Sequence, residues 1–527
     1  MIVHSKQEKK MKKNIFLSTC LLLSFLLVGC GNNDEFEGGF NSKEYDGDAM
    51  MNLEPLTDLP GNDDRFSEIV DNPFVKVSDE PVSTFSVDAD GAAYGIMRKY
   101  VNMGYTVNKS SVRIEEYLNY FTFDYAAPAD DHTVAINGEV GVCPWNTEHR
   151  LMRLGIKGKS LDADQMPQAN FVFLVDVSGS MDSKDKIELL KSGLIELTDQ
   201  LNPEDRISII TYSGEVKKLL ESTKAKNAHE IKNAIKKLSA EGCTAGGKAL
   251  EMAYKEALAN YIIGGNNRVI MGTDGDFNVG VTDTDLLVSM VESYARQGIY
   301  MTCCGFGTGN LNDSMMEKIS NAGNGTYNFI DCEKEMMKVF VNERERFCAV
   351  ANDAKCQVTF DSTLVSSYRL IGYENRVMSN EDFTDDTKDA GEIGAGQTIT
   401  ALYEVVPTEQ FETCFAESHT NRHPFATFDF RYKKSLSDAS LPLQLTLAVE
   451  DMYDNTLQLL PTSENFRFAA GVASYGMVLR DSPYKGNATL GSAIELVQSA
   501  CSFDPHGYRK ELVQLMGKYD TKDNKLE

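Results

Sequence analysis

The chain has 527 residues, of which 42% are apolar and 25% are charged, and its formal net charge is −26 at pH 7. The length exceeds one ordinary hydrophobic core, so two or three domains are expected, and the composition is that of a globular protein. The negative charge argues against nucleic acid and anionic lipid headgroups as partners, because both would be repelled.

The N-terminus has the pattern of a secretion signal. Residues 9–13 read KKMKK, and Ile15–Val28 is a mostly apolar run of 14 residues, shorter than the roughly 20 residues that span a bilayer. The run ends in Leu-Val-Gly-Cys, which resembles a bacterial lipobox; the resemblance implies that Cys30 is lipidated and becomes the new N-terminus. An ordinary cleaved signal peptide is the alternative, and Met11 is a second possible start.

The residues after Cys30 are rich in Asp, Glu, Gly and Asn and show no periodicity. This composition predicts a disordered tether, and about 40 such residues have a root-mean-square span of roughly 35 Å. Asp34-Glu35 resembles the acidic signals that send some Gram-negative lipoproteins to the outer face. We therefore expect a cell-envelope protein that a lipid anchors to the outer membrane, on its periplasmic or surface-exposed side.

The sequence holds eleven cysteines without any C-x-x-C pair, which favours neither a disulfide framework nor a zinc site. Cys303 and Cys304 lie in the apolar run YMTCCGF. We expect both to be buried strand thiols.

From Phe171 to about Phe347, apolar runs alternate with amphipathic segments. This alternation predicts an α/β domain with a doubly wound, mainly parallel sheet covered on both faces. The expected strands are 171–177, 206–212, 267–273, 300–306 and 326–330, and the expected helices are 187–201, 229–238, 247–261, 283–298, 313–323 and 332–347.

The flanks of this domain have a different pattern. Residues 425–434 and 441–450 alternate apolar and polar residues with period two, as half-buried antiparallel strands do, and the last sixty residues return to helical stripes. We expect the two β-rich flanks to pack together, with the α/β domain inserted between them. The expected segments are a signal peptide (1–29), the tether (30–75), an N-terminal α+β flank (76–165), the α/β domain (166–347) and a β-rich then helical C-terminal region (348–520).

Three loops of the α/β domain carry side chains with hard oxygen atoms. Asp176, Ser178 and Ser180 follow the first strand at every second position, Asp274 follows the strand 267–273, and Thr244 lies in a Gly-rich loop before a helix. Ligands of open α/β sheets bind beyond the carboxyl ends of the strands, where the strand order reverses. The three loops should therefore meet at one edge of the sheet.

Hydroxyls and a few carboxylates suit Mg²⁺, which prefers six oxygen ligands and keeps several of its waters. If most direct ligands are neutral hydroxyls, the ion keeps much of its positive charge. It then favours an anionic sixth ligand, such as a Glu or Asp carboxylate of another protein.

These motifs are similar to the metal-ion-dependent adhesion site of von Willebrand factor type A domains. The resemblance covers Asn170 to about Phe347 and implies that Ser178, Ser180 and Thr244 are hydroxyl ligands. It also implies that Asp176 and Asp274 are direct or water-bridged ligands. The segments 112–121, 368–376 and 385–396 further resemble those of a bacterial lipoprotein subgroup of this family, and the last helix of the domain, 332–347, could shift on ligand binding.

Other chemistries have weaker support. Gly242–Ala249 nearly matches a phosphate-binding loop, but Ala249 stands where Mg²⁺ needs a hydroxyl. Asp274–Asp285 resembles a calcium loop, but Val279 stands where an EF-hand needs Gly. Ser178 and Ser180 lie outside any nucleophile elbow, and Asp88 or Asp90 is expected only to cap a helix.

The sequence thus predicts a membrane-anchored binding protein without catalytic turnover. Its site would hold Mg²⁺, with Mn²⁺ or Ca²⁺ as other candidates, and would capture an acidic side chain of a protein partner. The alternative is a structural or assembly subunit of an envelope complex, in which the metal only stabilises the domain.

Overall fold

The computed structural model describes residues 57–129, 131–242, 247–275, 284–417, 422–453 and 462–523. The chain divides into two units, Met1–Leu53 and Glu54–Glu527, and all described residues belong to the second. The expected signal peptide, Cys30 and the first part of the expected tether lie outside the described residues. None of the helices in the described ranges combines the length and the apolar composition that a membrane span requires.

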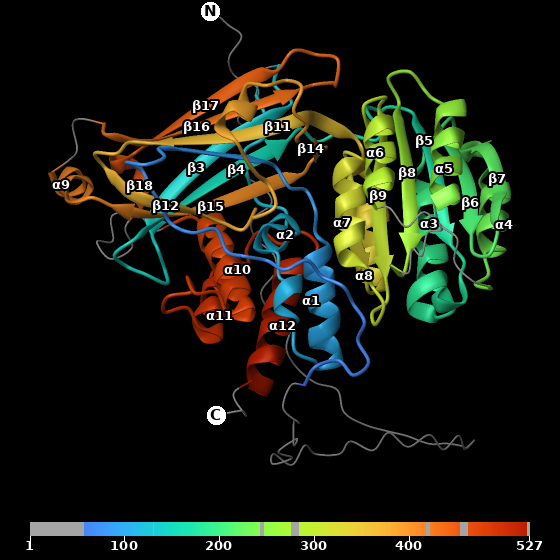
Figure 1. Cartoon of the computed structure of the whole chain (residues 1–527), viewed down its shortest axis with the longest axis horizontal. Coiled ribbons are helices and arrows are strands. Elements are labelled where there is room, and N and C mark those ends of the chain that lie inside the picture. Colours follow the sequence, from blue (N-terminus) through green and yellow to red (C-terminus); the bar gives the residue numbers. More distant parts are fainter. Residues whose placement is uncertain are drawn as a thin grey trace, which may run out of the picture. The chain divides into compact units, whose positions relative to one another are not determined.

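The α/β domain is built on a six-stranded sheet of order β10-β9-β8-β5-β6-β7 (Figure 1). Of the described strand pairs in this sheet, only β6 with β7 is antiparallel. The first strand, β5, lies between β6 and β8, so the strand order reverses there. The strands are β5 (Ala169–Asp176), β6 (Arg206–Tyr212), β7 (Val216–Lys224), β8 (Asn266–Thr273), β9 (Ile299–Phe306) and β10 (Thr326–Ile330).

Helices cover both faces of this sheet. Successive side chains of β5 point to opposite faces and are apolar on both, so each face needs a covering layer. Phe171 and Phe173 lie in one apolar cluster with α3, α4 and α8, whereas Val172 and Leu174 lie in another with α5, α6 and α7. The predicted fold class, a doubly wound α/β sheet, is confirmed. The helices are α3 (Leu189–Gln200), α4 (Ala228–Lys236), α5 (Gly247–Ala259), α6 (Thr284–Ala295), α7 (Asp313–Ala322) and α8 (Glu333–Met337).

Two elements of the domain differ from the expectation. The sequence VKKLLESTK forms the antiparallel strand β7, whose many charged residues obscure the period-two pattern and suit an edge strand. The segment 332–347 is a broken helix, in which α8 is followed by a π-helical turn, Lys338–Asn342, and a 3-10 turn, Arg344–Phe347.

The two β-rich flanks together form a two-sheet sandwich with a common apolar core. Strand β4 of the N-terminal flank pairs with β15 of the C-terminal region, and β2 pairs with β11. The prediction that the flanks pack together around an inserted α/β domain is confirmed. One sheet has the order β1-β12-β15-β4-β3-β18, and the other has the order β13-β2-β11-β16-β17 with β14 paired to β11.

The strands of the sandwich are β1 (Val75–Lys76), β2 (Val82–Ser86), β3 (Val134–Val142), β4 (Arg150–Gly158), β11 (Ala349–Phe360), β12 (Val365–Ile371), β13 (Val377–Met378), β14 (Gly391–Gly394), β15 (Thr398–Pro407), β16 (Pro424–Lys433), β17 (Leu441–Ala448) and β18 (Met452–Tyr453). The short helix α9 (Glu409–Glu417) follows β15.

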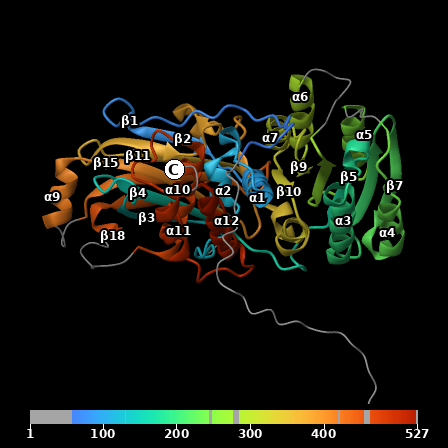
Figure 2. The ribbon, with the colours of Figure 1, turned by 90° about the horizontal axis from the view of Figure 1, so that it is seen from below.

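Helices from both flanks form a group below the sandwich in the view of Figure 1, and α1 of this group lies next to the α/β domain (Figures 1 and 2). Helix α1 contacts β10 of the α/β domain, and α2 contacts β15 of the sandwich. Helix α10 contacts α2, and α12 contacts α1. The helices are α1 (Ala92–Met103), α2 (Ile114–Asn119), α10 (Glu464–Arg480), α11 (Leu490–Gln498) and α12 (Tyr508–Asp523).

The described cysteines are all free thiols. Cys303 and Cys304 are fully buried in β9, as predicted, and burial raises the pKa of the Cys304 thiol to about 12.

Residues 57–70, which we call the N-terminal strap, are hydrogen-bonded to the α/β domain, so the ordered chain begins before residue 75. The Asp63 and Arg65 amides donate to the carbonyls of Gly309 and Leu311 at 3.0 and 2.8 Å. The carboxylate of Asp64 accepts from the amides of the same two residues, Gly309 and Leu311, at 2.7 and 2.8 Å. The acidic residues that predict a tether here therefore include Asp64, whose carboxylate is hydrogen-bonded to the loop after β9.

Candidate metal centre

The turn after β5 brings two serine hydroxyls together. Strand β5 is buried along its whole length and ends at Asp176, after which Met181 anchors the turn in the apolar core. The Oγ atoms of Ser178 and Ser180 lie 2.9 Å apart, and the Ser178 amide donates to Asp176 Oδ1 at 2.9 Å. Ser178 is buried and Ser180 is exposed, so the pair reaches from the sheet edge to the surface.

The end of β8 places a second carboxylate beside this turn. Strands β5 and β8 are parallel neighbours that pair up to Val175 and Gly272, so Asp176 and Asp274 follow at the same edge. Thr273 Oγ1 donates to Asp176 Oδ2 at 2.9 Å and accepts from the Gly275 amide at 3.1 Å. Both carboxylates are buried side chains at the carboxyl end of the sheet.

Asp176 has a shifted acidity. Burial raises the pKa of Asp176 to about 6, the hydrogen bonds from Ser178 lower it, and the charge of Asp274 raises it. Two carboxylates in one buried edge disfavour each other's ionised form. A cation between them would relieve this repulsion.

Thr244 lies outside the described residues, but the chain leading to it is attached to the serine turn. The Glu241 amide donates to the Val177 carbonyl at 2.7 Å, and the Gly179 amide donates to the Gly242 carbonyl at 3.1 Å. The structure therefore brings Asp176, Ser178, Ser180 and Asp274 together and leads the third loop to the same place.

Lys186 is a residue of this edge that the sequence interpretation missed. Its Nζ donates to Asp274 Oδ2 at 3.0 Å and to the Ser180 carbonyl at 2.9 Å. It lies in a π-helical turn, Lys184–Glu188, that leads into α3, and such turns are frequent at functional sites. A lysine six residues beyond Ser180, on the first turn after the motif, was the available signal.

The geometry of the described residues fits Mg²⁺. Adjacent ligands of an octahedral ion with bonds of about 2.1 Å lie about 3.0 Å apart, and the two serine oxygens have this separation. Both oxygens of Asp176 already accept hydrogen bonds, which suits a water-bridged ligand better than a direct one. Among the described residues, no group of three or more His, Cys, Asp or Glu could hold a metal, and a site based on hydroxyls needs none.

The rival motifs gain no support. Helix α4 precedes the loop of the phosphate-like motif, whereas a phosphate-binding loop follows a strand. Strand β8 precedes the calcium-like segment, whereas an EF-hand loop follows a helix.

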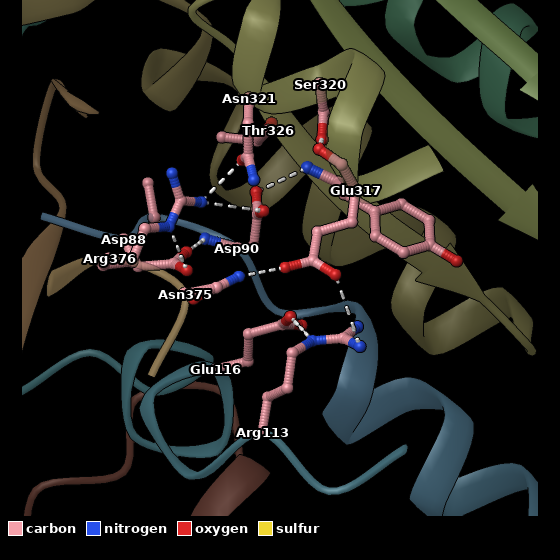
Figure 3. Close-up of polar contacts among 12 residues, drawn as sticks. Asp88, Asp90, Arg113, Glu116, Glu317, Ser320, Asn321, Thr326, Asn375 and Arg376 are labelled. Carbon is pink, nitrogen blue, oxygen red and sulfur yellow. Dashed lines mark hydrogen bonds and ion pairs between the residues drawn. The ribbon is translucent and has the colours of Figure 1, made fainter. Parts of the chain in front are cut away.

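A second buried polar cluster joins the α/β domain to both flanks (Figure 3). The guanidinium of Arg113, before α2, donates to Asp313 of α7 at 2.7 and 3.0 Å, and its Nε donates to Glu116. Arg376, before β13, donates to Asp88 at 2.9 Å and lies 3.6 Å from Asp90. We call Asp88, Asp90, Arg113, Glu116, Asp313, Glu317 and Arg376 the junction cluster.

The junction cluster corrects one expectation, because neither Asp88 nor Asp90 caps helix α1. Its N-cap residue is Gly91, which has no side chain with which to cap the helix. Asp90 instead accepts from the Tyr327 amide at 2.6 Å, and Glu116 accepts from the Ala93 amide at 2.7 Å. The acidic residues before α1 thus serve a contact between domains.

The sheet and the oxygen-bearing loops at its edge define a von Willebrand factor type A domain. Residues 170–342 match the family model described as the von Willebrand factor type A domain. Residues 60–153 match a model described as von Willebrand factor, and residues 345–521 match the model of the C-terminal region of the uncharacterized protein YfbK. The recognition of this domain with family-specific flanks is confirmed.

The chain is 36% identical over 464 residues to the uncharacterized protein YfbK of Escherichia coli K12, which covers 86% of this chain and 80% of that protein. The chain therefore belongs to the family of YfbK-like proteins with a von Willebrand factor type A domain. It is also 30% identical over 209 residues to the uncharacterized protein sll0103 of Synechocystis, covering 39% of this chain and 47% of that protein. Among solved structures, a von Willebrand factor type A protein of Catenulispora acidiphila has 14% identity and a TM-score of 0.43, over 74% of this chain and 91% of that chain.

Proposed function

We propose that the protein is a metal-dependent binding protein that captures an acidic side chain of a protein partner. Asp176, Ser178, Ser180, Thr244 and Asp274 would hold Mg²⁺, for which Mn²⁺ or Ca²⁺ could substitute. The bound ion would supply an electrophilic coordination position for the carboxylate of a partner's Glu or Asp. No catalytic turnover is proposed.

The observation that supports this proposal is the 2.9 Å separation of the Ser178 and Ser180 hydroxyls beside two buried carboxylates. Hydroxyl ligands are neutral and leave the charge of the ion largely uncompensated. An ion that keeps its charge attracts an anion, and the exposed position of Ser180 lets that anion come from another protein.

The proposed setting is the cell envelope. Lipidation of Cys30 would anchor the chain to the outer membrane, with the folded body on the periplasmic or surface-exposed side. If this is correct, Cys30→Ser abolishes incorporation of labelled palmitate and releases the protein from the membrane fraction. Retention of the label by that variant would exclude lipidation at Cys30.

Capture from envelope extract tests the binding function. Wild-type protein on a resin should retain a partner in Mg²⁺ and lose it in EDTA, while its circular dichroism spectrum stays folded. Asp176→Ala and Thr244→Ala should each abolish this capture with little loss of folding. Unchanged capture by either variant would refute the proposal.

The same experiment separates the alternative, a structural or assembly subunit. Direct hydrogen bonds join the loops of the site, and this observation supports the alternative, because a metal bound to the same loops would stabilise them further. In that case EDTA unfolds the domain itself, seen as loss of its circular dichroism signal, and assembly fails only as the domain unfolds.

A further inference from the structure

The amino group of Lys186 lies inside the candidate metal centre. Its Nζ is bonded to Asp274 and to the backbone of Ser180, and only 14% of its side chain is exposed. The Asp274 side chain that it contacts is fully buried. A charge pair of this kind, next to a cation site, changes the electrostatic potential that both the metal and its ligand experience.

The surrounding structure holds this lysine in place. Ile187, the next residue, is buried in the apolar cluster under α3. The carboxylate of the preceding Asp185 accepts from Ser183 Oγ at 2.7 Å and from Lys99 Nζ at 2.8 Å, so its charge is paired with a different lysine. Lys186 is therefore paired with Asp274 and not with its neighbour.

Gly307 makes room for the aliphatic part of this side chain. A Cβ atom at Gly307 would overlap Lys186 Cε, and the backbone there has a φ of +72°, which favours glycine. The loop after β9 thus leaves a passage through which Lys186 reaches the metal centre.

The net charge of the side chains at this edge determines which ligand the metal-loaded centre would bind. The two carboxylates of Asp176 and Asp274 would balance a divalent cation, and the ammonium of Lys186 then adds one positive charge. The loaded centre would carry a net positive charge among these groups. An anion from outside would neutralise it.

We infer that Lys186 is a positioning residue that sets the selectivity of this centre. It makes the centre bind its metal more weakly and bind an anionic ligand more strongly than the carboxylates and hydroxyls would alone. This inference rests on the proposed function, since it requires a cation beside Asp176, Ser178, Ser180 and Asp274.

Replacement of the charge tests the inference in two measurements. Lys186→Met should bind Mg²⁺ more tightly in calorimetry, by about tenfold for the loss of one unit charge at close range. With Mn²⁺ in the site, acetate should bind the variant several-fold more weakly, as measured by the relaxation of water protons. A merely structural role would weaken both affinities together, whereas a charge effect moves them in opposite directions.

Two matched variants serve as controls. Lys186→Arg keeps the charge and should stay close to wild type in both measurements. Lys184→Met removes an exposed lysine from the same turn and should change neither affinity. Melting curves of all variants verify that the domain is folded.

The outcomes separate this inference from the proposed function. If wild type binds Mg²⁺ and Lys186→Met leaves both affinities unchanged, or lowers both, Lys186 does not set the selectivity and the metal site stands. If wild type does not bind Mg²⁺, or if Asp176→Ala binds it as tightly as wild type, then both the proposed metal site and the role of Lys186 are wrong.

Discussion

We call the sheet edge that carries Asp176, Ser178, Ser180 and Asp274 the metal-centre edge. It buries two carboxylates and the junction cluster buries several, but different groups surround them. At the edge, Asp176 accepts from a serine amide and a threonine hydroxyl, and Asp274 is paired with one lysine. In the junction cluster, two arginines bind the carboxylates with direct, partly bidentate hydrogen bonds. The second arrangement supplies two guanidinium groups from the chain, and the first supplies one ammonium group.

The difference has a structural meaning. Bidentate arginine pairs fix geometry and are strong when buried. The junction cluster uses them to connect α7 of the von Willebrand factor type A domain with both flanks, which are distant in sequence. The described partners of the edge carboxylates include no arginine: Asp176 accepts from neutral groups, and Asp274 is paired with the single ammonium of Lys186.

The largest expected effect is the loss of an arginine from the junction cluster. Arg113→Leu leaves Asp313 and Glu116 without their buried partner, and breaking a buried pair in this way costs about 3–5 kcal/mol of unfolding free energy. Urea denaturation measures the loss. Asp176→Ala, at the metal-centre edge, should cost much less.

Arg296→Leu is the matched control for Arg113→Leu. Arg296 forms a pair with Glu292 on the exposed surface of α6, and such pairs contribute less than about 1 kcal/mol. If both arginine variants lose the same unfolding free energy, the buried ion pairs of the junction cluster do not stabilise the fold more than a surface pair does.

The second prediction concerns the pH dependence of the junction cluster. Burial raises the pKa of Glu116 to about 7, Arg113 lowers it, and Asp88 and Glu317 raise it. Since the folded state holds this proton more tightly than the unfolded state, the contribution of Glu116 to stability is present below about pH 4.5 and is lost as the pH rises to about 7. The loss is on the order of 3 kcal/mol.

Glu116→Gln isolates this contribution from all other titrating groups. Between pH 5 and 7.5, wild type should lose unfolding free energy relative to the variant, measured by urea denaturation at each pH. Equal slopes of stability against pH in the two proteins would show that Glu116 does not bind a proton in this range.

The placement of Asp176, Ser178 and Ser180 at one sheet edge was predictable because its signals are local. An apolar run that ends in Asp176, Ser178 and Ser180 marks a parallel strand and its carboxyl end within a few residues. The strand order then brings Asp274 alongside. Thr244 remains a prediction, as does the identity of the metal.

The junction cluster was not predictable from such signals. Arg113 meets Asp313 across 200 positions of sequence, and Arg376 meets Asp88 across 288. No periodicity shows which distant arginine lies beside which aspartate, so the sequence predicts only a local helix cap by Asp88 or Asp90. Strand β7 was missed for a related reason, since its many charged residues suit a sheet edge and hide the alternation.

Stabilisation by metal gives the third prediction. At a free Mg²⁺ concentration 100 times the dissociation constant, binding to the folded state adds about 2.7 kcal/mol. Wild type should gain this in a thermal melt, and Asp274→Asn should lose it. Asp182→Asn, an exposed carboxylate of the same turn as the serines, is the control and should keep the gain.

The smallest expected effect concerns the N-terminal strap, which supports the metal-centre edge from outside. Asp64 accepts from the amides of Gly309 and Leu311, and Gly275, the residue after Asp274, lies against Leu311. Asp64→Ala removes these two charge-assisted bonds and a third from the Tyr100 hydroxyl, and should cost about 2 kcal/mol of local stability. The Gly309 and Leu311 amides should then exchange hydrogen faster, and Mg²⁺ affinity should fall about threefold at most.

Asp63→Ala is the matched control, because the Asp63 side chain is exposed. The variant keeps the backbone bond of the strap and should leave exchange and affinity at the wild-type values. Faster exchange without any change in Mg²⁺ affinity would show that the edge holds its geometry through β5 and β8 alone, independently of the strap.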